Sequence, residues 1–274
     1  DATVLQLTEK LDGVRLPTLS VSQKEFDQAK ILLGEDDRDA ICAAATNIER
    51  FHQAQLPDSL SIETMPGVRC ERLTRPISEV GLYVPAGNAP LPSTALMLGI
   101  PARLAGCPTR VMCSPPQADG SIHPAVLYAA QICEISAVFK VGGAQAIAAM
   151  AYGTQSIPKV AKLFGPGNAW VTQAKTKVAQ DPLGAAQDMP AGPSEILIIA
   201  DQDANPAFVA ADLLSQAEHG PDSQVILVTT SKTLLESTLN EIEQQKKRLS
   251  RGEIIQESLM HSRAILVADL KTAL

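Results

Sequence analysis

The sequence predicts an α/β fold in which parallel sheets are covered by helices on both faces. From Tyr83 onward, short β-rich apolar segments alternate with amphipathic helical segments, which is typical of strands joined by helical crossovers. Hydrophobic residues make up 45% of the chain and aromatic residues only 3%, so the core must be aliphatic. The 274 residues suffice for one large domain or two of ordinary size.

The N-terminal part of the chain predicts helices first and then two strands. Helices are expected over residues 2–10, 22–34 and 35–55. The sequence Ser22-Gln-Lys-Glu25 is a capping box, which opens the second of these helices. Strands are expected over residues 68–73 and 80–84, and we expect them to pair with each other.

Strands and helices then alternate along the rest of the chain. Strands are expected over residues 110–113, 138–141, 160–164, 195–200, 225–229 and 264–267. Helices are expected over residues 92–106, 124–133, 144–152, 169–180, 205–219 and 233–249. Asn205 fits an N-cap and Pro206 the first helical position, where its missing N–H costs nothing.

Charge and cysteine usage restrict the classes of partner and compartment. The net charge is -7, which disfavours a nucleic acid or an anionic membrane as partner. No apolar run approaches the ~20 residues of a membrane span, and no signal peptide opens the chain. The five cysteines form no CxxC pair, which favours reduced thiols and a cytoplasmic protein.

The end of the helix over residues 205–219 carries a candidate metal site. Gln216 and His219 are three residues apart, so both side chains project from one edge of the helix. An amide oxygen and an imidazole there could hold a divalent metal. Two ligands are short of the about three or four that a zinc site uses. The alternative is that His219 only interacts with the helix dipole.

The turn Gly165-Pro-Gly-Asn-Ala-Trp170 nearly fits the dinucleotide-binding fingerprint. It lies between a predicted strand and a predicted helix, as that motif requires. Trp170 replaces the third glycine, which excludes the usual close packing of helix on strand. The alternative is an ordinary tight turn in which Asn168 is an N-cap.

Six further segments carry a resemblance to a known family. They are PGVRC (66–70), GLYVPAG (81–87), VGGAQAIAA (141–149), FGPGNAWV (164–171), DMPAGPSE (188–195) and LLSQAEHGPDSQ (213–224). In this order, and over nearly the whole chain, they resemble the histidinol dehydrogenase family of histidine biosynthesis. Chance agreement over segments of such unusual composition is not a serious alternative.

The resemblance implies a fold and a domain organisation. The fold would be two Rossmann-like parallel-sheet units of the aldehyde-dehydrogenase-like superfamily. Residues 82–193 would form the NAD-binding domain. Residues 1–81 together with residues 194–274 would form the first α/β domain, on the substrate and metal side. The chain would be a fragment that lacks the N-terminal and C-terminal portions of the family.

The resemblance also implies an activity and the residues that perform it. The family oxidises L-histidinol to L-histidine through L-histidinal, with NAD and zinc as cofactors. Three residues would contact NAD, namely Tyr83, Gln145 and Asn168.

The substrate and metal residues of the family match three further positions. Ser194, Gln216 and His219 would contact the substrate, and Gln216 and His219 would also ligate zinc. The catalytic Glu–His pair and two other zinc ligands are expected beyond Leu274. One of those ligands would come from the partner subunit of a homodimer with a shared active site.

Other functions stay open from the sequence. A related zinc and NAD dehydrogenase of another small alcohol, such as sulfopropanediol, would share the scaffold. A catalytically incomplete fragment or a binding module is the second alternative. Aldehyde dehydrogenases use a cysteine nucleophile, but no base lies near Cys113 in the sequence, which disfavours a covalent thiol mechanism.

Overall fold

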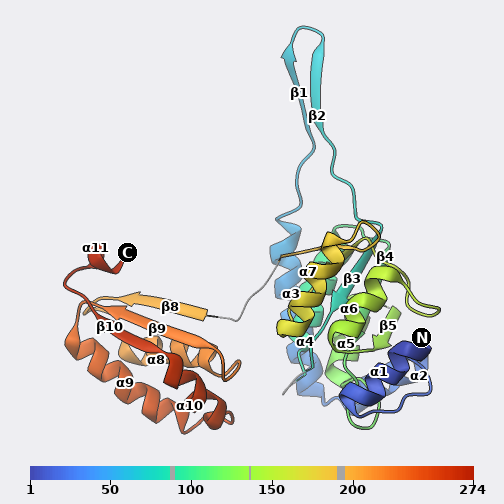
Figure 1. Ribbon diagram of the computed structural model, residues 1–274. Helices are drawn as coiled ribbons and strands as arrows, with labels where there is room; N and C mark the ends of the chain where they lie inside the picture. Colours follow the sequence, from blue (N-terminus) through green and yellow to red (C-terminus); the bar gives the residue numbers. More distant parts are fainter. Residues whose placement is uncertain (87–89, 136, 190–194) are drawn as a thin grey trace. The chain divides into compact units, whose positions relative to one another are not determined.

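The computed structural model describes residues 1–86, 90–135, 137–189 and 195–274. Contacts between residues divide the chain into two compact units, residues 1–191 and residues 192–274 (Figure 1). Both units are α/β with parallel sheets, as the sequence predicts. Within the described residues, no helix combines the length and the apolar character that crossing a membrane requires.

In the first unit, five of the described strands form a parallel sheet in the order β5-β4-β3-β6-β7. Its strands are β3 (Glu79–Tyr83), β4 (Thr109–Ser114), β5 (Ala137–Lys140), β6 (Lys162–Phe164) and β7 (Ala186–Gln187). The chain runs from β3 outward to β4 and β5, then returns to the other side of β3 with β6 and β7. The strand order therefore reverses between β3 and β6.

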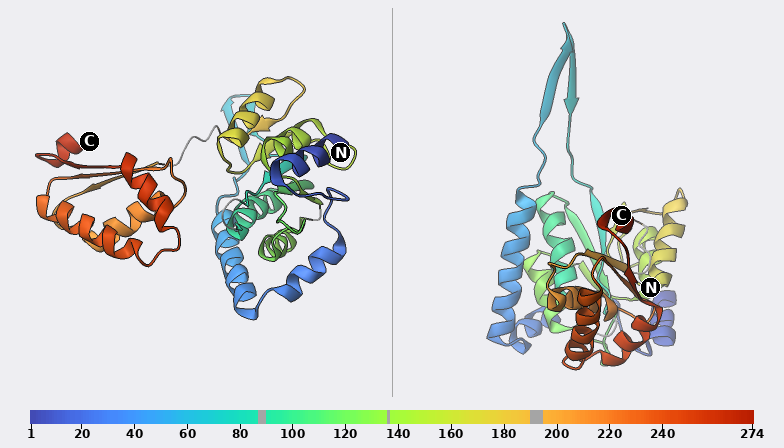
Figure 2. Two further views of the ribbon diagram at one scale, coloured as in Figure 1. Left: turned by 60° about the horizontal axis from the view of Figure 1, so that its bottom comes forward. Right: turned by 90° about the vertical axis from the view of Figure 1, so that its left-hand side faces the viewer.

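Helices cover both faces of this sheet (Figure 2). They are α1 (Ala2–Asp12), α2 (Gln23–Leu32), α3 (Glu35–Gln53), α4 (Pro92–Leu104), α5 (Pro124–Ile132), α6 (Gly143–Tyr152) and α7 (Ala169–Gln180). Successive strand residues point to opposite faces. Leu82 and Met112 pack with α2–α5, whereas Val111 and Cys113 pack with α1, α6 and α7.

Local capping chemistry sets the start of α2 as predicted. The Ser22 side chain accepts a hydrogen bond from the Glu25 backbone N–H, and the Glu25 carboxylate accepts one from the Ser22 backbone N–H at 2.8 Å. Capping thereby gives hydrogen-bond acceptors to two of the four N–H groups that have no partner within the first turn of the helix.

A β-hairpin corrects one sequence prediction. Strand β2 (Val68–Arg72) pairs antiparallel with β1 (Leu60–Met65), not with β3, and Gly67 in the connecting turn has a φ of +80°. The hairpin extends away from the five-stranded sheet (Figure 1). Its side chains are exposed on both faces, so β1 has no burial pattern from which the sequence could have identified it.

The second unit has three described parallel strands in the order β10-β9-β8. Its elements are β8 (Glu195–Ala200), α8 (Pro206–Ala217), β9 (Gln224–Thr229), α9 (Lys232–Lys246), α10 (Gly252–His261), β10 (Arg263–Leu266) and α11 (Leu270–Ala273). The predicted apolar stripe of α8 is buried, and Asn205 caps this helix by accepting from the Ala207 N–H at 2.9 Å. Helix α10 was not predicted.

The division into units differs from the expected grouping of residues 1–81 with residues 194–274. Phe26 of α2 and Ile41 of α3 are buried in the same core cluster as Leu96 of α4 and Leu127 of α5. Strand β3 begins at Glu79 in the middle of the first sheet. These contacts hold the N-terminal helices in the first unit.

Candidate functional site

The strand order reverses between β3 and β6 in the first unit. Tyr83 ends β3, and the turn from Gly165 to Asn168 follows β6 directly. Strands β3 and β6 are hydrogen-bonded neighbours, with Leu82 opposite Phe164. Open α/β sheets bind ligands outside the carboxyl ends of their strands at such a switch point.

Two glycines let the turn after β6 lie close against its neighbours. A Cβ atom on Gly165 would lie 2.2 Å from the Tyr83 carbonyl oxygen, and Gly165 has a φ of +124° that side-chain-bearing residues rarely adopt. A Cβ on Gly167 would lie 2.3 Å from Cγ1 of Val171. Trp170, at the third fingerprint position, is 76% exposed, so its bulk does not enter the helix–strand contact.

Asn168 caps α7, as the alternative interpretation of this residue predicts. Its Oδ1 accepts a hydrogen bond from the Val171 N–H at 3.1 Å, and the residue is exposed. The cap uses the amide oxygen only. The Nδ2 group is therefore a donor that capping does not engage, and it lies at the carboxyl edge of the sheet.

Tyr83 and Gln145 both approach Gly143, the first residue of α6. Tyr83 is 3% exposed, and its hydroxyl oxygen accepts a hydrogen bond from the Gly143 N–H at 2.9 Å. Burial raises the pKa of Tyr83 to about 12, although that hydrogen bond acts in the opposite direction. Its hydroxyl therefore keeps its proton at neutral pH. Gln145 Nε2 donates to Asp12 at 3.5 Å, and burial raises the pKa of the Asp12 carboxyl.

Two charged residues that the sequence analysis did not single out hold the same turn. Lys175 of α7 donates from Nζ to the Gly165 carbonyl oxygen at 2.9 Å and forms an ion pair with Asp188. Asp188 accepts from the Gly165 N–H at 2.9 Å. Lys175 lies in the buried stripe of α7 that faces the sheet. Helical periodicity in the sequence could have placed this lysine in that stripe, in the helix that follows the fingerprint-like turn, and so have indicated that it is buried.

The candidate metal ligands lie at the C-terminal end of α8, in the second unit. Gln216 is partly buried, and within the described part of the chain its Nε2 is buried without a hydrogen-bond partner. His219 is exposed, and its backbone N–H donates to the Gln216 carbonyl at 3.1 Å. A buried amide without an internal partner fits a residue that contacts a ligand. Ser194 lies outside the described residues.

The described residues do not complete a metal site by themselves. No group of three or more His, Cys, Asp and Glu side chains in the described ranges is arranged to hold a metal ion. Gln216 and His219 could supply two ligands, which is fewer than the about three or four that a zinc site uses.

Comparison with known proteins extends over the entire chain. A model of the histidinol dehydrogenase family matches residues 1–274. The chain belongs to the histidinol dehydrogenase family. It is 56% identical over 273 residues to histidinol dehydrogenase of Xanthomonas campestris pv. campestris (strain 8004), and 55% identical over 272 residues to that of Aliivibrio fischeri (strain ATCC 700601 / ES114).

The chain spans 63% and 61%, respectively, of the length of these two curated family members, while 100% and 99% of the chain are covered. The crystal structure of histidinol dehydrogenase from Elizabethkingia anophelis matches with a TM-score of 0.95 and 49% identity, covering 100% of this chain and 63% of that one. A putative methylmalonate-semialdehyde dehydrogenase from Sinorhizobium meliloti 1021 matches with a TM-score of 0.51 and 16% identity, over 90% of this chain and 50% of that one, which is a likeness of fold alone.

Cys113 does not have the environment of a nucleophile in this family member. The residue is fully buried, and burial raises the pKa of its thiol far above the ordinary value. A thiol that stays protonated at neutral pH is a poor nucleophile. The structure therefore agrees with the expectation that a covalent thiol mechanism is disfavoured.

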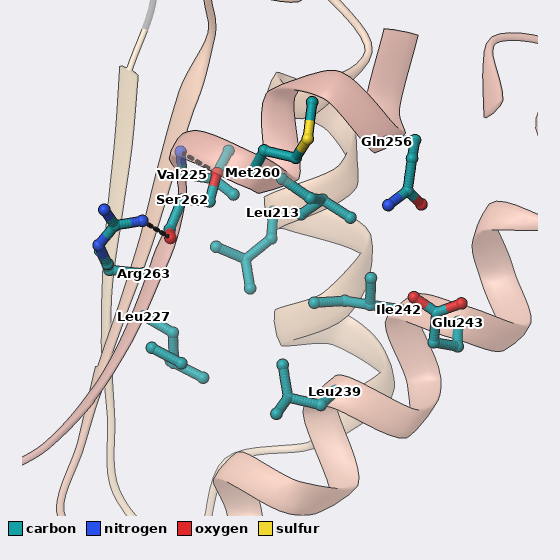
Figure 3. A pocket seen from close by; sticks show the side chains of 12 residues that line it. Leu213, Val225, Leu227, Leu239, Ile242, Glu243, Gln256, Met260, Ser262 and Arg263 are labelled. Atoms are coloured by element: carbon teal, nitrogen blue, oxygen red, sulfur yellow. Dashed lines mark hydrogen bonds between the residues drawn. The ribbon is translucent and has the colours of Figure 1, made fainter. Parts of the chain in front are cut away.

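A cavity of about 320 Å³ lies in the second unit (Figure 3). Its walls are mainly aliphatic side chains from α8, α9, α10 and the adjoining strands, among them Leu213, Leu227 and Ile242. At its rim, Glu243 and Gln256 both accept hydrogen bonds from Lys246. Because these polar groups are already paired and neither Gln216 nor His219 lines the cavity, we assign it no part of the site.

Proposed function

We propose that this chain forms the NAD surface and part of the zinc site of a histidinol dehydrogenase. The reaction is the oxidation of L-histidinol to L-histidine through L-histidinal, in two successive steps that each reduce one NAD. The observation that carries the proposal is the position of Tyr83 and of the Gly165–Asn168 turn at the strand-order reversal of a chain that matches the family from residue 1 to residue 274.

The NAD-binding residues we propose are Tyr83, Gln145 and Asn168. Each supplies a neutral hydrogen-bonding group at the carboxyl edge of the first sheet. The Tyr83 hydroxyl accepts from Gly143 and keeps its own proton, which it can donate to the dinucleotide. The Nδ2 of Asn168 supplies a second donor. The glycines of the turn let it lie close against Tyr83 and Val171, which keeps Asn168 at the carboxyl edge of the sheet.

The zinc ligands we propose from this chain are Gln216 and His219. When bound, zinc supplies a Lewis acid that polarises the oxygen of the amino alcohol. The side chains of Gln216 and His219 orient the substrate at the end of α8, and Ser194 is the third proposed substrate contact. The resemblance implies that the glutamate and histidine of acid–base catalysis lie outside residues 1–274, in the part of the family that this chain does not span.

Further parts of the proposal follow from the family rather than from a contact in this chain. We propose a cytoplasmic homodimer with a shared active site, and a fold of two Rossmann-like units of the aldehyde-dehydrogenase-like superfamily. The match to the Sinorhizobium meliloti structure supports the fold. The grouping of residues 1–81 with residues 194–274 as one domain, and of residues 82–193 as the NAD-binding domain, stays a prediction for the complete protein.

Turnover by the full-length protein tests the proposal. NADH formation is measured with L-histidinol and, separately, with sulfopropanediol, each with zinc and NAD present. We expect turnover with L-histidinol, with two NADH formed for each L-histidine. Turnover of sulfopropanediol alone would reassign the substrate, and absence of turnover with either alcohol would favour a protein without catalytic activity.

A further inference from the structure

The backbone of Gly165 is held by charged side chains on both of its polar atoms. Its N–H donates to the Asp188 carboxylate at 2.9 Å, and its carbonyl oxygen accepts from Lys175 Nζ at 2.9 Å. Lys175 and Asp188 also form an ion pair with each other. The three residues therefore form a closed hydrogen-bonded triangle around the first residue of the turn that carries Asn168.

This triangle connects three elements of the first unit. Lys175 lies two turns into α7, Asp188 follows β7, and Gly165 follows β6. The backbone N–H of Asp188 donates to the Leu163 carbonyl at 3.0 Å. The Asp188 carboxylate also accepts from the Met189 N–H at 2.7 Å. Asp188 is thus held through its backbone as well as through its side chain.

Burial makes the arrangement unusual for a pair that only stabilises the fold. Lys175 is 4% exposed, and the Asp188 side chain is 24% exposed. Removing two charges from water offsets most of their mutual attraction, so an apolar pair of similar volume would often stabilise as well or better. The charged pair instead supplies directed hydrogen bonds to both polar atoms of one peptide group, which apolar side chains cannot do.

The conformation of this turn matters because Gly165 lies against Tyr83, one of the three predicted NAD residues. Gly165 has a φ of +124°, and a Cβ atom on this residue would lie 2.2 Å from the Tyr83 carbonyl oxygen. The turn therefore lies directly on the end of β3. Asn168 follows three residues later. A change at Gly165 therefore changes where Asn168 and the start of α7 lie relative to Tyr83.

We propose that Lys175 and Asp188 are positioning residues, which fix the Gly165–Asn168 turn against Tyr83 for binding of a dinucleotide. The inference rests on the proposed function, because it takes NAD as the ligand of the turn. Lys175 acts through the turn and not by touching NAD, since its ammonium group is directed to the Gly165 carbonyl and to Asp188.

The test is a double-mutant cycle on NAD affinity in the full-length protein. Lys175→Met combined with Asp188→Asn removes both charges together and so avoids leaving an unpaired buried charge. Asn168→Ser removes the amide while keeping an N-cap oxygen. The matched control is Lys177→Met, which removes an exposed lysine from the same helix. Calorimetry gives the NAD dissociation constants, and hydrogen exchange reports the protection of the backbone at residues 165–168.

We expect the Lys175/Asp188 double variant to raise the dissociation constant for NAD about tenfold or more, because small misplacements of binding groups lower affinity steeply. We expect faster exchange at residues 165–168 and no change in either measurement for Lys177→Met. In the double-variant background, Asn168→Ser should have a smaller effect than in the wild-type protein, since the amide is already misplaced.

Two results separate the failure of this inference from the failure of the proposed function. If Asn168→Ser weakens NAD binding but the Lys175/Asp188 variant does not, or if the two effects are additive, the positioning role is wrong and the NAD site stands. If wild-type protein binds no NAD, or binds it without regard to Asn168, both proposals are wrong.

Discussion

Replacing Gly165 by alanine should strongly destabilise the first unit. The substitution places a Cβ 2.2 Å from the Tyr83 carbonyl oxygen and 3.0 Å from its carbonyl carbon, and both are backbone atoms that cannot rotate away. It also forces a side-chain-bearing residue to a φ of +124°. The strained backbone costs about 1–3 kcal/mol, and the steric overlap costs about a further 1–3 kcal/mol. We therefore expect a loss of about 4 kcal/mol in the free energy of unfolding.

Gly13→Ala is the matched control for this prediction. Gly13 ends α1 with a φ of +69°, and a Cβ there would meet no atom within 4 Å. Only the left-handed backbone is then penalised, by about 1 kcal/mol. The assay is urea unfolding of the full-length variants, followed by circular dichroism. Equal losses for the two variants would refute the argument, because the close approach of Gly165 to Tyr83 would then have no energetic consequence.

Two further predictions concern the metal ligand and the ion pair. His219→Asn should remove most zinc and most activity from the full-length protein. The fold should be kept, because a helix-end histidine contributes at most about 2 kcal/mol to stability through the helix dipole. Near-stoichiometric zinc in the variant, measured by mass spectrometry, would refute the assignment. Burial raises the pKa of Asp188, but hydrogen bonds from Lys175, Gly165 and Met189 outweigh it, so this pKa lies below its ordinary value. A carboxyl with a depressed pKa stabilises the fold above its unfolded-state pKa of about 3.9, and this stability is lost as the pH falls through the folded-state pKa. Unfolding free energies measured at a series of acid pH values should therefore fall less steeply for Asp188→Asn than for the wild-type protein. Parallel curves would count against the ion pair.

The elements that the sequence predicts well are those set by local chemistry. The cap at Asn205 and the apolar stripe of α8 depend on hydrogen bonds and spacings within a few residues of each other. The capping box of Ser22 and Glu25 is equally local. In contrast, β1 has all of its side chains exposed, so no alternation of buried and exposed residues marked it as a strand.

The arrangement of the candidate site depended on contacts that the sequence does not display. The reversal of strand order between β3 and β6 is a tertiary property. The hydrogen bond between Tyr83 and Gly143 joins positions 60 residues apart. Helical periodicity places Lys175 in the apolar stripe of α7, but Asp188 resembles an ordinary surface residue in the sequence. Only the fold brings the two side chains to the two polar atoms of Gly165.

The central claim is that the turn after β6 binds NAD through Asn168, and calorimetric titration of NAD into full-length wild-type protein and Asn168→Ser tests it most directly. Serine keeps the N-cap, so the free energy of unfolding should change by less than about 0.5 kcal/mol. Loss of the amide donor should raise the dissociation constant for NAD about tenfold, the equivalent of one hydrogen bond. Equal dissociation constants in the two proteins would show that Asn168 only caps α7.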